Sequence, residues 1–254
     1  MHPSGNTMLI TGGTSGIGRA LAEAFHRNGN RVIIAGRRQA LLDEITAANP
    51  GMRGMQLDVQ DPATIDAFAA AIGEQFPDLN VLINNAGISR TEDLTAGTVD
   101  LSVARSIIQT NVVAVLHLTA ALLPTLRRQH RSTIITTSSG LAFVPRADYP
   151  TYCATKAFLH SWLQSLRRQL VESSVEVLEL LPPYVQTELG GPAQATDPDA
   201  VPLADYVAEV MQILMRADLP NGEILVERVK ALRWAERNGV YAQVFAVLNG
   251  REDR

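Results

Sequence analysis

Tyr152 and Lys156 place a phenol and an ammonium group four residues apart, in the segment YCATK. Positions i and i+4 of an α-helix share one face, so both side chains would point into one cleft. A free tyrosine titrates near pH ~10, and an ammonium group about 4–5 Å away would favour the phenolate by roughly 3–4 kcal/mol at an effective dielectric of about 20. The pair is therefore suited to acid/base chemistry on a substrate oxygen, although the same spacing also fits an ordinary half-exposed helical pair.

A strand, a glycine-rich turn and a helix are predicted near the N-terminus. Residues 8–10 form a short apolar run, residues 11–18 contain the loop TGGTSGIG, and residues 19–28 have the apolar spacing of an amphipathic helix. Glycines let a backbone approach a pyrophosphate closely, and the positive end of the helix dipole favours that anion. Tight turns alone could explain the glycines, but the flanking strand and helix favour a dinucleotide site.

The second predicted strand, residues 31–36, ends where an NAD-binding site would carry an acidic residue for the ribose 2′-hydroxyl. This chain has Arg37 and Arg38 there. A guanidinium at this point would stack on adenine and pair with a 2′-phosphate. We therefore expect NADP(H) as the preferred cofactor, with NAD(H) as the alternative. The simpler interpretation is that both arginines are solvated residues opening the next helix.

Strands and helices alternate at even spacing along the rest of the chain, and one helix start is marked by Asp61 as N-cap and Pro62. The pattern predicts an α/β fold, a single-domain doubly wound parallel sheet (Rossmann fold) of about seven strands with helices on both faces. Further strands are expected at residues 53–57, 81–83, 133–137, 175–180 and 223–226, and further helices at residues 39–48, 62–75, 102–128, 152–170 and 202–217.

Composition excludes several classes of protein. A hydrophobic fraction of 46% is typical of a globular chain, and a net charge of −4 gives no reason to expect a nucleic-acid partner. Cys153 is the single cysteine, and the chain starts without an apolar signal region, so we expect a cytoplasmic protein. The longest apolar run, residues 112–126, is too short to span a bilayer. We expect neither a membrane partner nor a metal.

We interpret residues 1–254 as one domain. Residues 188–200 are rich in Gly, Pro, Ala and Asp without periodicity, which predicts a mobile flap over a cleft. The flap and the helix after it extend over about residues 188–218. Residues 227–254 form a C-terminal extension, in which an Asn-Gly pair divides two expected helices.

In this order the motifs resemble the short-chain dehydrogenase/reductase superfamily. The match covers about residues 7–187 and rests on the glycine loop, on the segment NNAG after the fourth strand, and on a tetrad. The tetrad is Asn111, Ser139, Tyr152 and Lys156.

Neighbouring residues offer two alternatives to this tetrad. Ser139 is preferred to Ser138 because its separation of 13 residues from Tyr152 is usual in the family. Tyr149 is excluded as the catalytic tyrosine because its i+4 neighbour is a cysteine. Tyr149 and Tyr184 flank the expected cleft, so with Ser139 they are candidates for substrate contact.

The resemblance implies a role for each member of the tetrad. Lys156 would lower the pKa of Tyr152 and bind the nicotinamide ribose, while Tyr152 passes a proton to or from the substrate oxygen during hydride transfer. Ser139 would hold that oxygen, and Asn111 would hold a water that links Lys156 to solvent.

Cofactor contacts are expected along the glycine loop and the carboxyl ends of the strands. Asp58 would meet the adenine amino group, and Val185 and Thr187 would meet the carboxamide. The full set is Gly12, Thr14, Ser15, Gly16, Ile17, Gly18, Arg37, Arg38, Asp58, Val59, Asn85, Ala86, Gly87, Tyr152, Lys156, Pro182, Val185 and Thr187.

The chain departs from the family pattern at two places. Pro182 and Pro183 stand where the family has Pro-Gly, which predicts a stiffer turn. The C-terminal extension replaces the glycine-rich tail of many members. This extension and the segment LLPPYVQTEL resemble the DltE-like oxidoreductase subgroup. Its name implies a link with D-alanylation of teichoic acids, but nothing in the tetrad or the flap selects such a substrate, and we do not carry the link over.

We therefore predict an NADP(H)-dependent oxidoreductase that interconverts a carbonyl and an alcohol in a small molecule. The alternative is a non-catalytic NADP(H)-binding sensor or partner protein on the same fold. The long helices at residues 102–128 and 152–170 predict a homodimer, with a tetramer as the alternative. His117, Cys153 and the two tryptophans are interpreted as packing residues.

Overall fold

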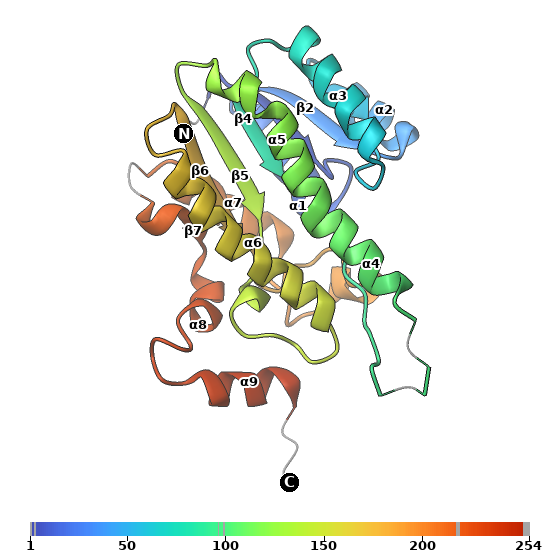
Figure 1. Cartoon of the computed structure of the whole chain (residues 1–254), viewed down its shortest axis with the longest axis vertical. Helices are drawn as coiled ribbons and strands as arrows, with labels where there is room; N and C mark the ends of the chain where they lie inside the picture. Colours follow the sequence, from blue (N-terminus) through green and yellow to red (C-terminus); the bar gives the residue numbers. More distant parts are fainter. Residues whose placement is uncertain (1, 3, 96, 99, 217–218, 251–254) are drawn as a thin grey trace.

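The computed structural model describes residues 2, 4–95, 97–98, 100–216 and 219–250. Its centre is a parallel seven-stranded sheet in the order β3-β2-β1-β4-β5-β6-β7, which confirms the predicted fold (Figure 1). The strands are β1 (Thr7–Thr11), β2 (Arg31–Gly36), β3 (Arg53–Gln56), β4 (Val81–Asn84), β5 (Ser132–Thr137), β6 (Val175–Leu181) and β7 (Glu223–Leu225).

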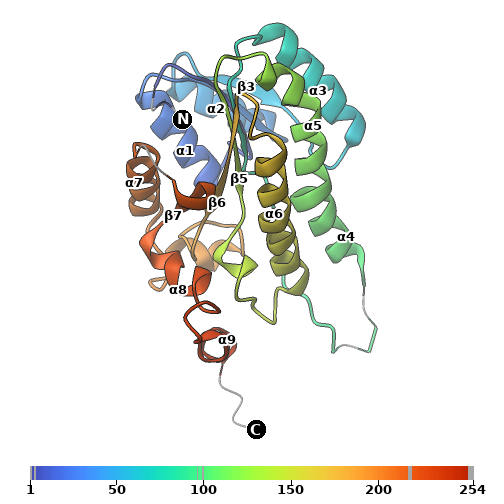
Figure 2. The same ribbon diagram turned by 60° about the vertical axis from the view of Figure 1, so that its left-hand side comes forward.

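Helices cover both faces of the sheet, with α1 and α7 on one side and α3, α5 and α6 on the other (Figure 2). The helices are α1 (Gly16–Arg27), α2 (Gln39–Ala48), α3 (Pro62–Gln75), α4 (Ser102–Ile108), α5 (Ala114–Arg127), α6 (Pro150–Gln169), α7 (Leu203–Leu214), α8 (Lys230–Arg233) and α9 (Tyr241–Asn249). A π-helical segment, Gln109–Val113, joins α4 to α5.

The alternation of side chains along β1 fills both layers of the core. Met8 and Ile10 pack with α1, α2 and α7, while Leu9 between them packs with α3, α5 and α6. Successive side chains of a strand point to opposite faces, and a parallel sheet that is covered on both sides needs apolar residues on both. This explains why the strands are continuous apolar runs.

The sheet reverses its strand order between β1 and β4, since β2 and β3 extend one way from β1 and β5 to β7 extend the other way. In a doubly wound sheet, ligands bind at the carboxyl ends of the strands on either side of such a reversal. The loops that follow β1, β2, β4, β5 and β6 therefore converge on one edge.

Ser102–Arg127 is the one helical stretch among the described residues that is long and apolar enough to cross a membrane by length and composition. The apolar run at residues 112–126 is thus part of a longer helical stretch. Its length therefore does not exclude a membrane-spanning helix, contrary to the expectation from the sequence. Half of its apolar window is buried, and α5 packs against α3 and the sheet. We take it as a core helix because its apolar side faces other parts of the protein.

Element boundaries differ from expectation mainly near the loops. Helix α1 begins at Gly16, inside the glycine loop. The flap region contains a 3₁₀ turn, Pro192–Thr196, and a bridge between Val185 and Val201, so it is folded; its mobility stays a prediction. The C-terminal extension does form two helices, α8 and α9. The ends of the expected 202–217 helix and of the extension lie partly outside the described residues.

Candidate active site

The glycine loop between β1 and α1 is closely packed against the loop after β4. Gly12 has φ +65°, and a Cβ there would lie 2.9 Å from Ala86 Cα. A Cβ on Gly18 would lie 2.3 Å from the carbonyl oxygen of Gly12. Side chains are excluded at both positions, so the backbone of the loop remains accessible to a phosphate group. Ser15 is the N-cap residue of α1, and its side chain makes no capping hydrogen bond with the helix.

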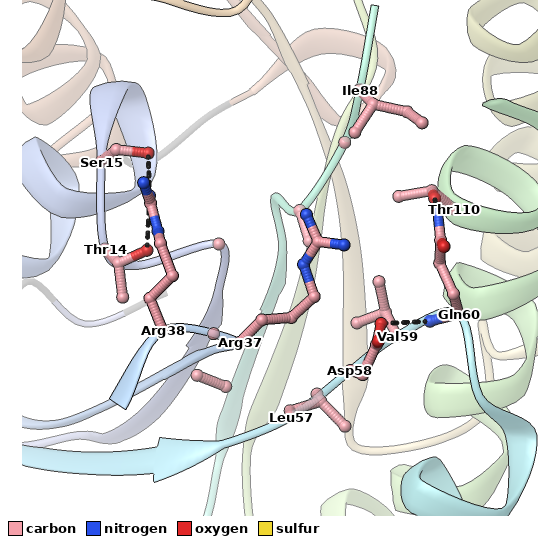
Figure 3. Close-up of a pocket in the computed structure, with 15 residues that line it drawn as sticks. Thr14, Ser15, Arg37, Arg38, Leu57, Asp58, Val59, Gln60, Ile88 and Thr110 are labelled. Carbon is pink, nitrogen blue, oxygen red and sulfur yellow. Dashed lines mark hydrogen bonds between the residues drawn. The ribbon is translucent and has the colours of Figure 1, made fainter. Parts of the chain in front are cut away.

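A pocket of about 170 Å³ lies beside this loop at the ends of β2 and β3 (Figure 3). Arg38 Nη2 donates to Thr14 Oγ1 at 3.3 Å and to Ser15 Oγ at 3.5 Å. Arg37 extends between this pair and Asp58, whose carboxylate accepts from the Gln60 backbone N–H at 3.0 Å. Two guanidinium groups and one carboxylate therefore line a space suited to the adenosine part of a dinucleotide.

A larger cleft of about 610 Å³ continues from that pocket across the carboxyl edge of the sheet. It contains both the glycine loop and three members of the expected tetrad, Ser139, Tyr152 and Lys156. The other expected contacts that line it are Gly12, Thr14, Ser15, Gly16, Ile17, Arg37, Arg38, Asn85, Ala86, Gly87, Pro182, Val185 and Thr187. Val59 and Asp58 line the smaller pocket.

Helix α6 brings the tyrosine and the lysine together, as the spacing predicted. Both are buried, with 7% of Tyr152 and 4% of Lys156 exposed. Lys156 Nζ lies 5.5 Å from the centroid of the Tyr152 ring and donates to the carbonyl oxygen of Thr137 at 2.8 Å. Ser139, two residues beyond Thr137, accepts from the Leu141 backbone N–H at 3.1 Å, which orients its hydroxyl.

The expected lowering of the Tyr152 pKa is not found. Burial raises the pKa of Tyr152 to about 12, although a hydrogen bond with Ser139 acts in the opposite direction. Burial also lowers the pKa of Lys156 to about 8, against the attraction of Glu179. Desolvation favours the neutral form of each group, and it is the largest cause of both pKa shifts. Near neutral pH the tyrosine is therefore protonated.

Asn111 is buried within the π-helical segment and does not line the cleft. Its Oδ1 accepts from the Ile88 N–H at 2.9 Å, and its Nδ2 donates to the Ile88 carbonyl at 2.9 Å and to Thr155 Oγ1 at 3.3 Å. The asparagine thus ties the loop after β4 to α6. A Cβ on Gly87 would lie 3.3 Å from Asn111 Oδ1 and 3.8 Å from Lys156 Nζ, so this glycine lies between them.

Three other expected site residues also lie outside the described lining of the cleft. Gly18 packs beneath the loop and contributes its small size. Tyr149 lies under the guanidinium of Arg146, at 5.1 Å from ring centroid to Cζ, and Tyr184 donates to Asp197 Oδ2 at 3.0 Å. The two tyrosines bind neighbouring loop residues because the flap and the 140–150 loop meet there. Their predicted substrate contact stays a prediction.

The turn after β6 keeps its place in the cleft despite its second proline. Pro182 and Pro183 both line the cleft, and the Pro182 carbonyl accepts from the Gly140 N–H at 3.0 Å. The flap is fastened behind it by Gln194, whose Nε2 donates to the Val185 carbonyl at 2.7 Å. Leu189 and Gln194 also line the cleft, and composition alone did not single them out.

A buried polar cluster under the site was missed from the sequence. Glu179 on β6 binds Ser138 and His160, with Ser138 Oγ to Oε1 at 2.5 Å and His160 Nδ1 to Oε2 at 2.8 Å. The spacing of residues on α6 could have indicated His160, since it lies four residues after Lys156, as Lys156 lies four residues after Tyr152.

The packing interpretations of other residues agree with the structure. His117 Nε2 binds Asp66 Oδ1 at 2.7 Å and so joins α5 to α3. Cys153 is buried, and its Sγ donates to the Arg146 carbonyl at 3.7 Å. Trp162 packs on the core, and Trp234 contacts arginine side chains of the C-terminal extension.

Comparisons with known proteins agree with this geometry. The family model described as short chain dehydrogenase matches residues 6–198. Uncharacterized oxidoreductase DltE from Bacillus subtilis (strain 168) is 40% identical over 255 aligned positions, covering 100% of both chains. Serine 3-dehydrogenase from Agrobacterium fabrum is 34% identical over 197 positions, covering 75% of this chain and 78% of that one. A short-chain dehydrogenase from Sphingobium yanoikuyae, solved with NADPH, is 28% identical with a TM-score of 0.78, covering 98% of this chain and 97% of that one.

Proposed function

Because this chain belongs to the short-chain dehydrogenase family, we propose that it is an NADP(H)-dependent oxidoreductase that interconverts a carbonyl and an alcohol. The observation that carries the proposal is the shared cleft, in which Ser139, Tyr152 and Lys156 face the same space as the glycine loop. A dinucleotide that lies along the loop would thereby bring its nicotinamide to the acid/base pair.

The residues present fit such a cofactor, since the glycine loop has no room for side chains and a basic pocket continues from it. Bound nicotinamide would supply or accept the hydride at this site. In reduction, Tyr152 donates its phenolic proton to the substrate oxygen, because burial keeps the phenol protonated near neutral pH. Ser139 binds the same oxygen, and Lys156 stabilises the phenolate that is left behind.

A preference for NADP(H) is supported by the arginines after β2. Arg38 reaches back over the glycine loop to Thr14 and Ser15, where a 2′-phosphate on the adenosine ribose would lie, and Arg37 faces the same pocket. NAD-binding sites carry an acidic residue at the end of the second strand, and its charge would repel this phosphate. In this chain β2 ends at Gly36 and the two arginines follow it. The solved relative with NADPH has the same fold.

The test is reduction of a panel of small aldehydes and ketones with NADPH, and oxidation of small alcohols, including L-serine and 3-hydroxy acids, with NADP⁺. Turnover of any member, followed as absorbance of the reduced nicotinamide, supports the proposal and identifies the substrate class. Tight NADPH binding with no turnover across the panel would favour the alternative, a cofactor-binding sensor.

We also propose a homodimer in the cytoplasm. The outer faces of α4 to α6 carry exposed apolar side chains, with Ile108 44%, Val113 41% and Phe158 43% exposed. Exposed apolar residues on two neighbouring helices are suited to packing against a second copy. Sedimentation at micromolar concentration tests the assembly.

A further inference from the structure

Four polar side chains follow one face of α6 at intervals of four residues: Tyr152, Lys156, His160 and Gln164. The first two belong to the proposed acid/base site. The last two form a hydrogen-bonded chain that runs inward from the surface. Gln164 Nε2 lies 2.8 Å from His160 Nε2, and His160 Nδ1 lies 2.8 Å from Oε2 of Glu179.

Glu179 is 1% exposed and lies on β6, next to the edge strand β7. Ser138 Oγ donates to its Oε1 at 2.5 Å, so both carboxylate oxygens are bound by neighbouring residues. A buried carboxylate is costly unless hydrogen bonds and opposite charges compensate it. The hydrogen bonds come from Ser138, just after β5, and from His160 on α6. The compensating positive charge must come from groups that face the same region.

Two cations act on this carboxylate, and a third binds the neighbouring one. Lys156 and Arg167 on α6 are both attracted to Glu179. Arg233 on α8 binds the second buried carboxylate, Glu223 on β7, through two hydrogen bonds of 2.9 and 2.8 Å. Arg167 also interacts with Glu223 and donates from Nε to the Val177 carbonyl at 2.9 Å. Arg233 is paired with Glu223, so the basic groups that face Glu179 are His160, Lys156 and Arg167.

A metal ion is the alternative explanation, because ligand-type atoms of His160, Glu179 and Glu223 lie within 4.8 Å of one another. Each carboxylate, however, is already bound by protein donors: Ser138 and His160 on one, Arg233 on the other. The cluster is accounted for by ion pairs and hydrogen bonds.

Ser138 and Lys156 both line the cleft, and Lys156 is the charged one. Its ammonium group is held at the end of β5 by Thr137, next to Ser138, and one helical turn before His160. Glu179 therefore binds two residues close to the lysine: Ser138, which follows the lysine's partner Thr137, and His160, one turn further along α6. Burial alone disfavours the charged lysine, and a fixed carboxylate in the same apolar region opposes that effect.

We propose that Glu179 is the buried counter-ion that keeps the positive charge on Lys156, and that Ser138 and His160 hold its carboxylate in place for this purpose. Glu179 is then a positioning residue, which acts on the reaction through the lysine. The proposal rests on the proposed function only for its role in catalysis, since the charge relation is a property of the protein alone.

The composition of the chain allows a direct test. Only Lys156 and Lys230 are lysines. Lys230 is on the surface, so Lys230→Arg in protein labelled with ¹³C at the lysine ε-carbon leaves Lys156 as the single lysine signal. Its NMR shift is followed as a function of pH in the full-length chain. We expect a midpoint near 8 in this background, and in Glu179→Gln a midpoint lower by roughly half a unit or more.

Glu172→Gln is the matched control, because it removes the same charge from an exposed turn just after α6, where solvent screens it. If the Lys156 midpoint in Glu179→Gln moves no further than in this control, the proposal is overturned. Glu179→Asp keeps the charge but withdraws it by one methylene, and we expect a smaller downward shift. This second variant decides the question if Glu179→Gln does not fold: an unchanged midpoint in it would contradict the proposal.

Failure of this inference can be told apart from failure of the proposed function. The titration requires neither cofactor nor substrate, so a lowered midpoint in Glu179→Gln supports the counter-ion role even in a chain without turnover. An unchanged midpoint in an enzyme that reduces carbonyls would leave the reductase assignment intact and remove only the role of Glu179.

Discussion

Lys156 on α6 donates a hydrogen bond to the carbonyl oxygen of Thr137, the last residue of β5, at 2.8 Å. The bond joins the helix that carries Tyr152 to the sheet edge that carries Ser139. An ammonium group has three N–H donors, and this contact uses one. Because Lys156 lines the cleft, its other two N–H groups can donate to the hydroxyl groups of a bound ligand.

This buried ammonium group predicts a pH dependence. Burial lowers the pKa of Lys156 to about 8, so its charged form is lost as the pH rises through about 8. Tyr152 stays protonated over the same range because burial raises its pKa to about 12. We expect kcat/KM for carbonyl reduction, which reports groups of the free enzyme, to be level at neutral pH and to fall above about 8. A level profile up to about pH 10 would contradict the assigned role of the lysine.

Arg38→Gln should change cofactor choice. A charge-assisted hydrogen bond to a phosphate is worth about 1.5–3 kcal/mol, so we expect NADPH affinity to fall about tenfold or more while NADH affinity stays within about twofold. Fluorescence titration with each cofactor measures both. Arg53→Gln at the start of β3 removes the same charge from an exposed position at the far end of the strand and is the control. Equal losses for the two cofactors would show that Arg38 does not read the 2′-phosphate.

Gly18→Ala should destabilise the protein. The added Cβ would lie 2.3 Å from the Gly12 carbonyl oxygen and 2.4 Å from Asn85 Nδ2, and overpacking of this kind costs about 1–3 kcal/mol. Thermal unfolding should therefore begin at a lower temperature, and NADPH should bind more weakly. Gly97→Ala serves as the control, since nothing lies within 4 Å of a Cβ there. Equal melting temperatures for the two variants would contradict the close packing of the loop.

Phe158→Glu should dissociate the proposed dimer. The side chain is 43% exposed on α6, and a carboxylate at an apolar contact would have to be desolvated. Sedimentation velocity should show a dimer for the unaltered chain and a monomer for the variant. Val171→Glu, at an exposed position beyond α6, should stay dimeric. A monomeric unaltered chain would exclude the assembly.

Much of the fold and most of the cleft lining could be predicted from the sequence, because the signals are local. The glycine loop lies between one strand and one helix, and the interval from Tyr152 to Lys156 lies within a single helix. Side chains close in sequence and fixed by one element keep their relation in any packing of that element. The same holds for Arg38, the second residue after β2.

What could not be predicted depends on contacts between distant elements. The direction of the Tyr152 pKa depends on how completely the fold buries the ring. Tyr149 and Tyr184 turn toward loop residues that come together only in three dimensions. Glu179 faces α6 because it alternates with Leu178 and Leu180, which pack in the other layer of the core, and the register of β5 and β6 sets it beside Thr136. The prediction of a strand at residues 175–180 does not indicate which helix packs over that carboxylate.

The most direct test of the account is Tyr152→Phe, which removes one hydroxyl group and leaves the ring in its buried position. Because the phenol is assigned as the proton donor, we expect the rate of carbonyl reduction with NADPH to fall by about 10²–10⁴-fold. The Kd for NADPH should change by less than about threefold, since the contacts of the glycine loop and Arg38 remain. Turnover that persists at the rate of the unaltered protein would contradict the assignment of this cleft as the active site.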